Sequence, residues 1–470
     1  MTQAYELKGK RVLVVGLART GIATALFCAA RGARVTATEA RPESEVSEAA
    51  AKLRAAGCVL ELGGHREETF LVQELIVPSP GVPADTPFLQ AARAKGIPIW
   101  SEIELAYRFL KGKLIGITGS NGKTTTAALI AHVLETAGFP VILAGNIGTP
   151  LVARVEETSD SSICVVEMSS FQLELIESLR PDIGVLLNLT PDHLDRHPSL
   201  DAYGRAKARL FENQTKGDAA ILNADDPGLK AYAPTRAQVF WFSRRQAIDQ
   251  GALLRGSEIV FRRGGTEEVL LRRENIGLPG AHNLENVLAA AAAAFLSGAP
   301  PEAIATGVTS FAGVEHRLEF VAEIQGVRYY NDSKATNVDA TLKALDAFPG
   351  RILVILGGKD KGSDYTVLQQ SLREKAALAL LIGAAADKIE KQIAESVSIE
   401  RTGTIERAVE IASRRARPGD TVLLAPACAS FDQFQNYEHR GRRFKQLVRQ
   451  LEEHVAPASA RAASGQERKG

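Results

Sequence analysis

The chain has 470 residues, a length at which chains usually divide into roughly two to four domains. Hydrophobic residues make up 45% of it and charged residues 24%, which is the composition of a water-soluble globular protein. The 56 basic residues nearly balance the 55 acidic ones. This balance argues against a broad basic surface for nucleic acid or anionic lipid.

The four cysteines, at positions 28, 58, 164 and 428, form no CxxC pair. We therefore expect buried, reduced thiols and neither a zinc ribbon nor a disulfide framework. The first residues, MTQAYELKGKRVLVVG, lack the apolar run of a signal peptide, and no stretch reaches the roughly 18 apolar residues of a membrane helix. These features predict a cytoplasmic protein that binds no membrane, and the near-neutral net charge is compatible with a monomer.

Apolar strands alternating with helices open the chain. Strands are predicted at residues 12–15, 35–38, 75–77 and 97–100, with a helix at 20–30 after the first of them. Continuous apolar strands of this kind indicate a parallel sheet covered by helices on both faces. We assign residues 1–110 to a first, Rossmann-like domain.

Two further cycles follow. In residues 111–312, strands are predicted at 114–118, 141–143, 163–166, 183–187 and 219–222, a small flanking sheet at 239–271, and helices at 281–297 and 301–310. In residues 313–455, strands are predicted at 328–331, 352–356, 379–382 and 421–424. Residues 456–470 have no apolar period and are predicted to be a disordered tail. The fold class is α/β, with three consecutive domains, of which the second is P-loop ATPase-like and the third Rossmann-like.

The strongest chemical signal is the segment Gly119-Ser120-Asn121-Gly122-Lys123-Thr124-Thr125, which follows a predicted strand and opens a helix. Glycines let backbone N–H groups turn toward one anion, and the helix amino terminus adds a favourable dipole. Lys123 would reach the β- and γ-phosphates of a nucleotide, and the Thr124 hydroxyl would coordinate Mg²⁺. Ile117 stands where the strict phosphate-loop pattern has its first glycine. The alternative is a glycine turn that caps a helix beside an incidental lysine.

A second turn, from Gly16 to Gly21, also joins a strand to a helix, but Ala18 replaces the middle glycine of a dinucleotide-binding fingerprint. An ordinary strand–helix turn and a nucleotide-phosphate site are both compatible with it. Residues after neighbouring strands would line the same crevice. The candidates for this site are Leu17, Ala18, Arg19, Thr20, Glu39, Arg41, Ser79 and Gly81.

Polar residues gather after two strands of the second cycle. Glu167 ends an apolar strand, where an acid would hold Mg²⁺ directly or through water, although a helix-capping or surface acid has the same pattern. After the next strand comes a crowded segment that contains Asp192, His193 and His197, in which His193 is the better ligand candidate. Lys207, on a predicted helix, has by itself the pattern of a surface lysine.

Several segments together resemble the motifs of the Mur ligases, the bacterial amide-forming ligases of peptidoglycan synthesis. They are GSNGKTT, EMSSFQLE, NLTPDHLDRH, YGRAKARLFE, NADD, LPGAHNLEN, EHRLE and NDSKATN, and the resemblance extends from the first strand to about Val455. Within the family, NDSKATN, GGKDKGSD and APACASFDQF are most similar to the branch that adds D-glutamate. The resemblance implies ATP, UDP-N-acetylmuramoyl-L-alanine and D-glutamate as substrates and two Mg²⁺ ions as cofactors.

The resemblance also implies roles for single residues. Lys123, His193, Lys207 and Lys334 are the implied catalytic residues, and Lys207 is the lysine that CO₂ carbamylates. The implied metal ligands are Thr124, Glu167, His193 and carbamylated Lys207. Residues implied around ATP are Asn283, Asn286, Arg317 and Asp332. Asn146 is implied to contact the muramoyl substrate, and the implied D-glutamate site consists of Thr336, Lys361, Ser430, Phe431 and Tyr437. Tyr437 departs from the family pattern, which often has phenylalanine at that position.

A ligase of this kind activates a carboxylate with ATP and then joins it to an amine, so cations must offset the repulsion between triphosphate and carboxylate. The general base stays open between His193 and an acidic neighbour. Three other readings also stay open: a phosphate-loop ATPase or kinase, a nucleotide-binding regulator without turnover, and a sister ligase with another amine specificity.

Overall fold

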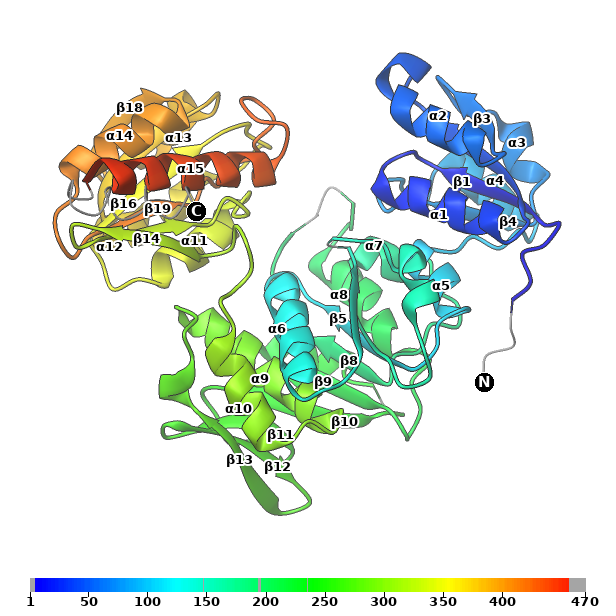
Figure 1. Cartoon of the computed structure of the whole chain (residues 1–470), viewed down its shortest axis with the longest axis horizontal. Helices are drawn as coiled ribbons and strands as arrows, with labels where there is room; N and C mark the ends of the chain where they lie inside the picture. The colour runs from blue at the N-terminus through cyan, green and yellow to red at the C-terminus, as the bar shows by residue number, and fades with distance from the viewer. Residues whose placement is uncertain (1–4, 147, 193–195, 235, 456–470) are drawn as a thin grey trace, which may run out of the picture. The chain divides into compact units, whose positions relative to one another are not determined.

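A computed structural model of the chain describes residues 5–146, 148–192, 196–234 and 236–455. Two compact units are present: Met1–Ile276 with Glu285–Phe311, called unit 1, and Gly277–Leu284 with Ala312–Gly470, called unit 2. Many elements of both units are labelled in Figure 1. The three-domain boundaries stay a prediction, and the tail predicted at 456–470 lies outside the described residues.

Unit 1 begins with a four-stranded parallel sheet in the order β3-β2-β1-β4. Its elements are β1 (Arg11–Val15), α1 (Arg19–Ala30), β2 (Arg34–Glu39), α2 (Ser47–Ala55), β3 (Val59–Leu62), α3 (Glu67–Leu71), β4 (Leu75–Pro78), α4 (Pro87–Ala94) and α5 (Glu102–Tyr107). The strand predicted at 97–100 is reduced to a single bridge between Ile76 and Ile99. Pro98 has no N–H and cannot extend a ladder.

A nine-stranded sheet follows in unit 1, in the order β13-β12-β11-β10-β9-β8-β5-β7-β6. Its strands are β5 (Lys113–Thr118), β6 (Val141–Gly145), β7 (Ile163–Glu167), β8 (Ile183–Leu186), β9 (Ala219–Asn223), β10 (Gln238–Ser243), β11 (Gly251–Arg255), β12 (Glu258–Arg263) and β13 (Thr266–Arg272). Pairing is parallel from β6 to β11 and antiparallel from β11 to β13. The predicted flanking strands are therefore hydrogen-bonded onto the main sheet through β9 and β10.

The helices that accompany this sheet are α6 (Lys123–Thr136), α7 (Ser170–Leu173), α8 (Leu200–Ala208), α9 (Ala281–Leu296) and α10 (Pro301–Ser310). Short 3₁₀ segments are η1 (Glu43–Glu45), η2 (Leu151–Ala153), η3 (Val155–Glu157), η4 (Arg209–Phe211), η5 (Pro227–Tyr232) and η6 (Arg273–Asn275). The helix α10 packs against α6 and β13. The two closing helices predicted at 281–297 and 301–310 are confirmed.

Unit 2 contains a six-stranded sheet in the order β14-β15-β19-β16-β17-β18, parallel except for the β14–β15 hairpin. Its elements are β14 (Glu319–Ile324), β15 (Val327–Asn331), α11 (Val338–Asp346), β16 (Ile352–Gly357), η7 (Tyr365–Leu368), α12 (Gln369–Lys375), β17 (Ala376–Ile382), α13 (Ala386–Ile393), β18 (Ile399–Gly403), α14 (Ile405–Arg415), β19 (Thr421–Leu424) and α15 (Tyr437–Val455). Figure 1 shows α15 running alongside α14, with which it is in contact.

Helices cover both faces of the unit 2 sheet. Successive residues of a strand point to opposite faces, and those of β16 alternate between two hydrophobic clusters. Val354 and Leu356 pack in the cluster that contains residues of α11, α12 and α13. Leu353 and Ile355 pack in the cluster that contains residues of α14 and α15. This two-sided burial makes β16 a continuous apolar run and confirms the predicted α/β class.

All four cysteines are buried and unpaired, as predicted. Among the helices that the structure describes, each is too short or too polar to cross a lipid bilayer.

Candidate functional site

A glycine-rich turn joins β5 to α6. Gly119 and Gly122 have φ values of 151° and 84°, which favour glycine over residues that carry a Cβ. A Cβ on Gly122 would lie 2.3 Å from Oδ1 of Asn286, a buried residue of α9. The turn therefore brings α9 against the amino end of α6, where helix N–H groups and the dipole attract anions.

The segment after β8 fixes the shape of this turn. The Ser120 hydroxyl donates to the Thr190 carbonyl oxygen at 3.0 Å and accepts from the Thr190 N–H at 2.9 Å. The Asn121 N–H donates to Oδ1 of Asn188 at 2.8 Å. Because these bonds run between the carboxyl ends of adjacent parallel strands, they hold the turn at the edge where such sheets bind ligands.

Two lysines converge on the turn. Lys123 Nζ donates to the carbonyl oxygens of Gly119 and Ser120, each at 2.9 Å. Lys207 Nζ, on α8, donates to the same Gly119 oxygen at 2.8 Å, and Lys207 is only 1% exposed. Burial, and next the charge of Lys123, lower the pKa of Lys207 well below its usual value, although Asp192 and Glu167 oppose the shift. The structure thus corrects the surface pattern that the sequence gives for Lys207.

Glu167 ends β7 beside the turn and is 3% exposed. Its Oε1 accepts from Asn146 Nδ2 at 3.3 Å, while its Oε2 is buried with no hydrogen-bond partner among the described residues. Gly145 permits this approach of β6 to β7, because a Cβ there would lie 2.3 Å from the Glu167 carbonyl oxygen. An unpartnered buried carboxylate oxygen costs free energy unless a proton or a cation satisfies it.

His193 lies outside the described residues, so its predicted metal-ligand role stays a prediction. His197 is buried; its Nε2 lies 2.9 Å from the Ser170 hydroxyl, and its ring stacks on Phe171 with centroids 5.5 Å apart. These contacts give His197 a packing role, in agreement with the choice of His193 as the better ligand candidate.

In the first sheet, the Glu39 carboxylate connects two predicted substrate residues. It accepts from the Leu17 N–H at 2.7 Å and from the Arg41 guanidinium at 3.0 and 3.1 Å. The side-chain bonds from Arg41 are the largest cause that lowers the pKa of Glu39 to about 2. Leu17 and Arg41 line a pocket of about 440 Å³ with residues of η1 and α2. A charged group fixed beside a pocket at the carboxyl ends of β1 and β2 suits a polar ligand.

The remaining uridine-nucleotide candidates of unit 1 lie in the turns that follow β1 and β4 and at the start of α1. Ala18 caps α1 with an extended backbone, and the Thr20 carbonyl oxygen accepts from Thr24. Arg19 Nη1 donates to the Gly148 carbonyl oxygen at 2.9 Å, near the loop that carries Asn146. The Ser79 hydroxyl donates to Gly16 at 3.0 Å, and the Gly81 carbonyl oxygen accepts from Arg196 at 3.3 Å.

In unit 2, a buried acid lies near two predicted cations. Asp332 is 2% exposed and accepts from the Leu318 N–H at 3.3 Å. Burial raises the pKa of Asp332 to about 6, against the opposing effects of Arg317, the Leu318 N–H and Lys334. The Nε of Arg317 is buried without a hydrogen-bond partner among the described residues. Perturbed ionisable groups beside an unpartnered donor are typical of a functional site.

Arg440, which the sequence analysis did not select, joins two of the predicted loops. It is fully buried and donates to the Cys428 carbonyl oxygen at 3.2 Å and to the Ser333 carbonyl oxygen at 2.8 Å. It also bonds the Ser333 hydroxyl and the Ala429 carbonyl oxygen. Burial lowers the pKa of Arg440 to about 10. One guanidinium thus fixes the Ser333 loop against the loop that precedes Ser430. In the sequence, Arg440 is one of several arginines in a helical segment, and nothing there distinguishes it from a surface residue.

The predicted D-glutamate residues differ in exposure. Ser430 is buried at the turn after β19, whereas Phe431 is 66% exposed and Lys361 is exposed. The Thr336 N–H donates to the Lys334 carbonyl oxygen at 2.8 Å. Tyr437 begins α15, and its ring centroid lies 5.7 Å from Lys334 Nζ.

Unit 1 therefore brings the phosphate turn, Lys207, Glu167, Asn146 and Asn286 together. Asn283 belongs to unit 2, where its Nδ2 donates to the Pro279 carbonyl oxygen at 2.6 Å. The unit 1 cluster combines cationic and N–H donors with an unpartnered carboxylate oxygen. That combination suits a polyphosphate and its metal counterion.

Family models match most of the chain. The Mur ligase MurD-like N-terminal domain matches residues 10–101, the Mur ligase middle domain residues 117–294, and the Mur ligase glutamate ligase domain residues 316–428.

Curated relatives match nearly the whole length. A protein of Solibacter usitatus is 53% identical, covering 95% of this chain and 99% of its own. One of Acidobacterium capsulatum is 53% identical, covering 94% and 97%, and one of Koribacter versatilis is 50% identical, covering 95% and 99%. All three are named UDP-N-acetylmuramoylalanine–D-glutamate ligase.

Solved structures share the fold at low identity. The MurF ligase from Thermotoga maritima in complex with ADP has a TM-score of 0.60 at 16% identity, covering 96% of this chain and 98% of its own. The UDP-N-acetylmuramate-alanine ligase MurC from the same organism has a TM-score of 0.59 at 19% identity, covering 94% and 100%.

Proposed function

We infer, since the chain belongs to the Mur ligase family, that it uses ATP to join D-glutamate to UDP-N-acetylmuramoyl-L-alanine in peptidoglycan precursor synthesis. The carrying observation is the identity of 50 to 53%, over at least 94% of this chain and 97% of each relative, to proteins named for that reaction.

The reaction has two steps. The alanine carboxylate attacks the γ-phosphorus of ATP and gives an acyl phosphate and ADP, because a free carboxylate has no adequate leaving group. The amine of D-glutamate then attacks the carbonyl carbon, and the tetrahedral intermediate expels inorganic phosphate. Lys123 now donates to two carbonyl oxygens of its own turn. A phosphate oxygen would replace those acceptors and let Lys123 stabilise the charge that develops during transfer.

Glu167 and Thr124 would hold Mg²⁺. The unpartnered Oε2 of Glu167 and the hydroxyl at the start of α6 are oxygen donors of the kind that Mg²⁺ prefers. When bound, the ion neutralises triphosphate charge and polarises the γ-phosphoryl group. A second Mg²⁺, with His193 and carbamylated Lys207 among its ligands, is part of the proposal.

Carbamylation of Lys207 is supported by its surroundings. CO₂ reacts with a neutral amine, and burial beside Lys123 favours the neutral form of Lys207. The carbamate would replace a buried neutral amine with an anion next to the lysine of the phosphate turn, a gain in electrostatic complementarity.

Substrate contacts are proposed for both units. The pocket beside Leu17, Arg41 and Glu39 would receive part of the uridine nucleotide, with Ala18, Arg19, Thr20, Ser79, Gly81 and Asn146 along its path. Asn283, Asn286, Arg317 and Asp332 would contact ATP, and Lys334 would act on the transferring phosphoryl group. Thr336, Lys361, Ser430, Phe431 and Tyr437 would bind D-glutamate.

A panel of amines offered with ATP, Mg²⁺ and UDP-N-acetylmuramoyl-L-alanine tests this function. We expect phosphate release with D-glutamate and little with L-glutamate, L-alanine or meso-diaminopimelate. Release that needs no amine would indicate an ATPase, and release that depends on another amine would indicate a sister ligase.

A further inference from the structure

A second pocket lies at the amino-terminal edge of the unit 2 sheet. It has a volume of about 410 Å³, and its lining includes Arg351 before β16, Leu378 of β17, Glu400 of β18 and Arg417 before β19. The predicted D-glutamate residues Lys361 and Ser430 follow the carboxyl ends of strands in the same sheet. The pocket is therefore at the opposite edge from the proposed amino-acid site.

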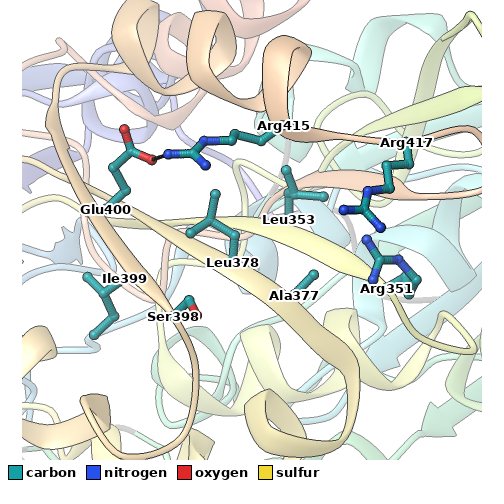
Figure 2. Close-up of a pocket in the computed structure, with 9 residues that line it drawn as sticks. All are labelled: Arg351, Leu353, Ala377, Leu378, Ser398, Ile399, Glu400, Arg415 and Arg417. Atoms are coloured by element: carbon teal, nitrogen blue, oxygen red, sulfur yellow. Dashed lines mark ion pairs between the residues drawn. The ribbon is translucent and has the colours of Figure 1, made fainter.

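The two ends of the pocket differ in charge. Figure 2 shows Arg351 and Arg417 with their guanidinium groups directed toward each other at one end. At the other end Arg415 pairs with Glu400 at 3.5 Å. Apolar side chains of Leu353, Ala377 and Leu378 lie between them (Figure 2). The pocket therefore combines a cationic end with an apolar middle.

The arginines of this set differ in how directly an acid pairs with them, and Arg417 is attracted by the Asp420 carboxylate only at longer range. Arg351 is paired with Asp420, whose Oδ1 lies 2.7 Å from its Nε. Arg417 donates only its backbone N–H to Asp420, at 3.0 Å. Within the described residues, no carboxylate oxygen lies within 4.0 Å of the Arg417 guanidinium, and this group makes no hydrogen bond. Two guanidinium groups that face each other repel, and an anion bound between them would add to the attraction that Asp420 exerts on both.

The backbone conformation and the ion pair of Arg351 both fix the position of this residue at the cationic end of the pocket. Arg351 has a φ of 51°, in the left-handed region that residues with a Cβ adopt only at a cost. The Asp420 carboxylate holds the Arg351 side chain with two bonds, from Nε at 2.7 Å and from Nη2 at 3.2 Å. Asp420 is buried, so this anchor is fixed while the neighbouring Arg417 remains exposed to a ligand.

We propose that this pocket binds a small organic oxyanion, with its phosphate or carboxylate head between Arg351 and Arg417 and an apolar body over Leu353 and Leu378. Planar guanidinium groups bind either head group with paired hydrogen bonds. The apolar body would gain affinity by burial against the leucines. The pocket contains none of the residues proposed for the ligase reaction. A failure of the anion-binding proposal would therefore leave the proposed ligase function unaffected, and the reverse also holds.

Calorimetric titration of the full chain tests the proposal, with ADP and Mg²⁺ saturating the nucleotide site. The probes are phenyl phosphate, benzoate and inorganic phosphate. We expect phenyl phosphate or benzoate to bind about tenfold or more tightly than inorganic phosphate, because only they carry an apolar body. The tighter of the two identifies the head group. Failure of both organic anions to bind would overturn the proposal.

Matched variants locate the binding. Arg417→Gln should lower the affinity for the organic anion by about tenfold or more, because charge-assisted hydrogen bonds are lost. Arg414→Gln changes a neighbouring exposed arginine that pairs with Glu410 outside the pocket, and it should leave binding unchanged. Ligase activity and the melting temperature of both variants should match the wild type, which shows that they fold. Equal weakening by both variants, or none by Arg417→Gln, would contradict the assignment.

Discussion

Lys207 Nζ and the Gly119 carbonyl oxygen are separated by 88 residues in the chain and by 2.8 Å in space. This bond ties α8 to the glycine turn and places a buried amine beside Lys123. The chemistry proposed for the cluster follows from that crowding of two basic groups around one backbone oxygen.

Lys207 is expected to carry a carbamate. Bicarbonate labelled with carbon-13 should give the wild type a carbamate carbonyl resonance in the NMR spectrum that Lys207→Ala lacks. The exposed Lys216→Ala variant should keep it. Lys207→Ala should also lose activity by at least about a hundredfold, because the proposed anion would be absent. A resonance that persists in Lys207→Ala would assign the modification elsewhere.

Glu167→Gln should raise the Mg²⁺ concentration needed for half-maximal activity by about tenfold to a hundredfold. The amide retains the oxygen but removes the charge that a cation would neutralise. Phosphate release measured across a Mg²⁺ titration gives this value. The exposed Glu157→Gln serves as the control, and identical titrations for both variants would exclude Glu167 as a ligand.

Glu102→Gln tests a buried acid of α5. Its Oε1 accepts from the Val152 N–H at 2.7 Å, its Oε2 has no partner among the described residues, and burial raises its pKa to about 7. The folded state therefore binds this proton more tightly than the unfolded state. The resulting stabilisation is complete below the ordinary glutamate pKa and is lost as the pH rises through about 7.

Because glutamine stays neutral, Glu102→Gln should be more stable than the wild type at alkaline pH, by on the order of 3 kcal/mol, and close to it at acid pH. Urea unfolding at pH values on either side of the transition measures the difference. The exposed Glu135→Gln should show no such trend. If the difference in unfolding free energy between Glu102→Gln and the wild type does not change with pH, the raised pKa of Glu102 is refuted.

Arg440→Lys should raise the KM for D-glutamate by about tenfold while the KM for the uridine nucleotide stays near that of the wild type. A lysine cannot bridge the acceptors on Ser333, Cys428 and Ala429 that one guanidinium spans. Steady-state kinetics with each substrate varied separate this positioning role from a general loss of folded enzyme. That loss would lower kcat and leave both KM values alone.

Much of the fold could be predicted because buried parallel strands are continuous apolar runs. The strand β16 is buried at every position, and its prediction was confirmed. The strands β14 and β18 were missed because they lie at sheet edges and carry exposed charged residues among half-buried ones. An edge strand of this kind has no apolar run to recognise.

The phosphate turn was predictable because its glycines, lysine and helix start are adjacent in the sequence. The burial of Lys207 was not, since it depends on how α8 packs against a turn far away in the chain. Arg440 was missed for the same reason: its acceptors lie 11 to 107 residues away.

The most direct measurement is D-glutamate-dependent formation of the amide product, detected by mass spectrometry, in the wild type and in Lys123→Ala. The exposed Lys113→Ala, at the start of β5, is the control. We expect Lys123→Ala to form the amide on the order of a thousandfold more slowly or worse, and the control to match the wild type. Undiminished amide formation by Lys123→Ala would contradict the account, because the glycine turn would then not be where phosphoryl transfer occurs.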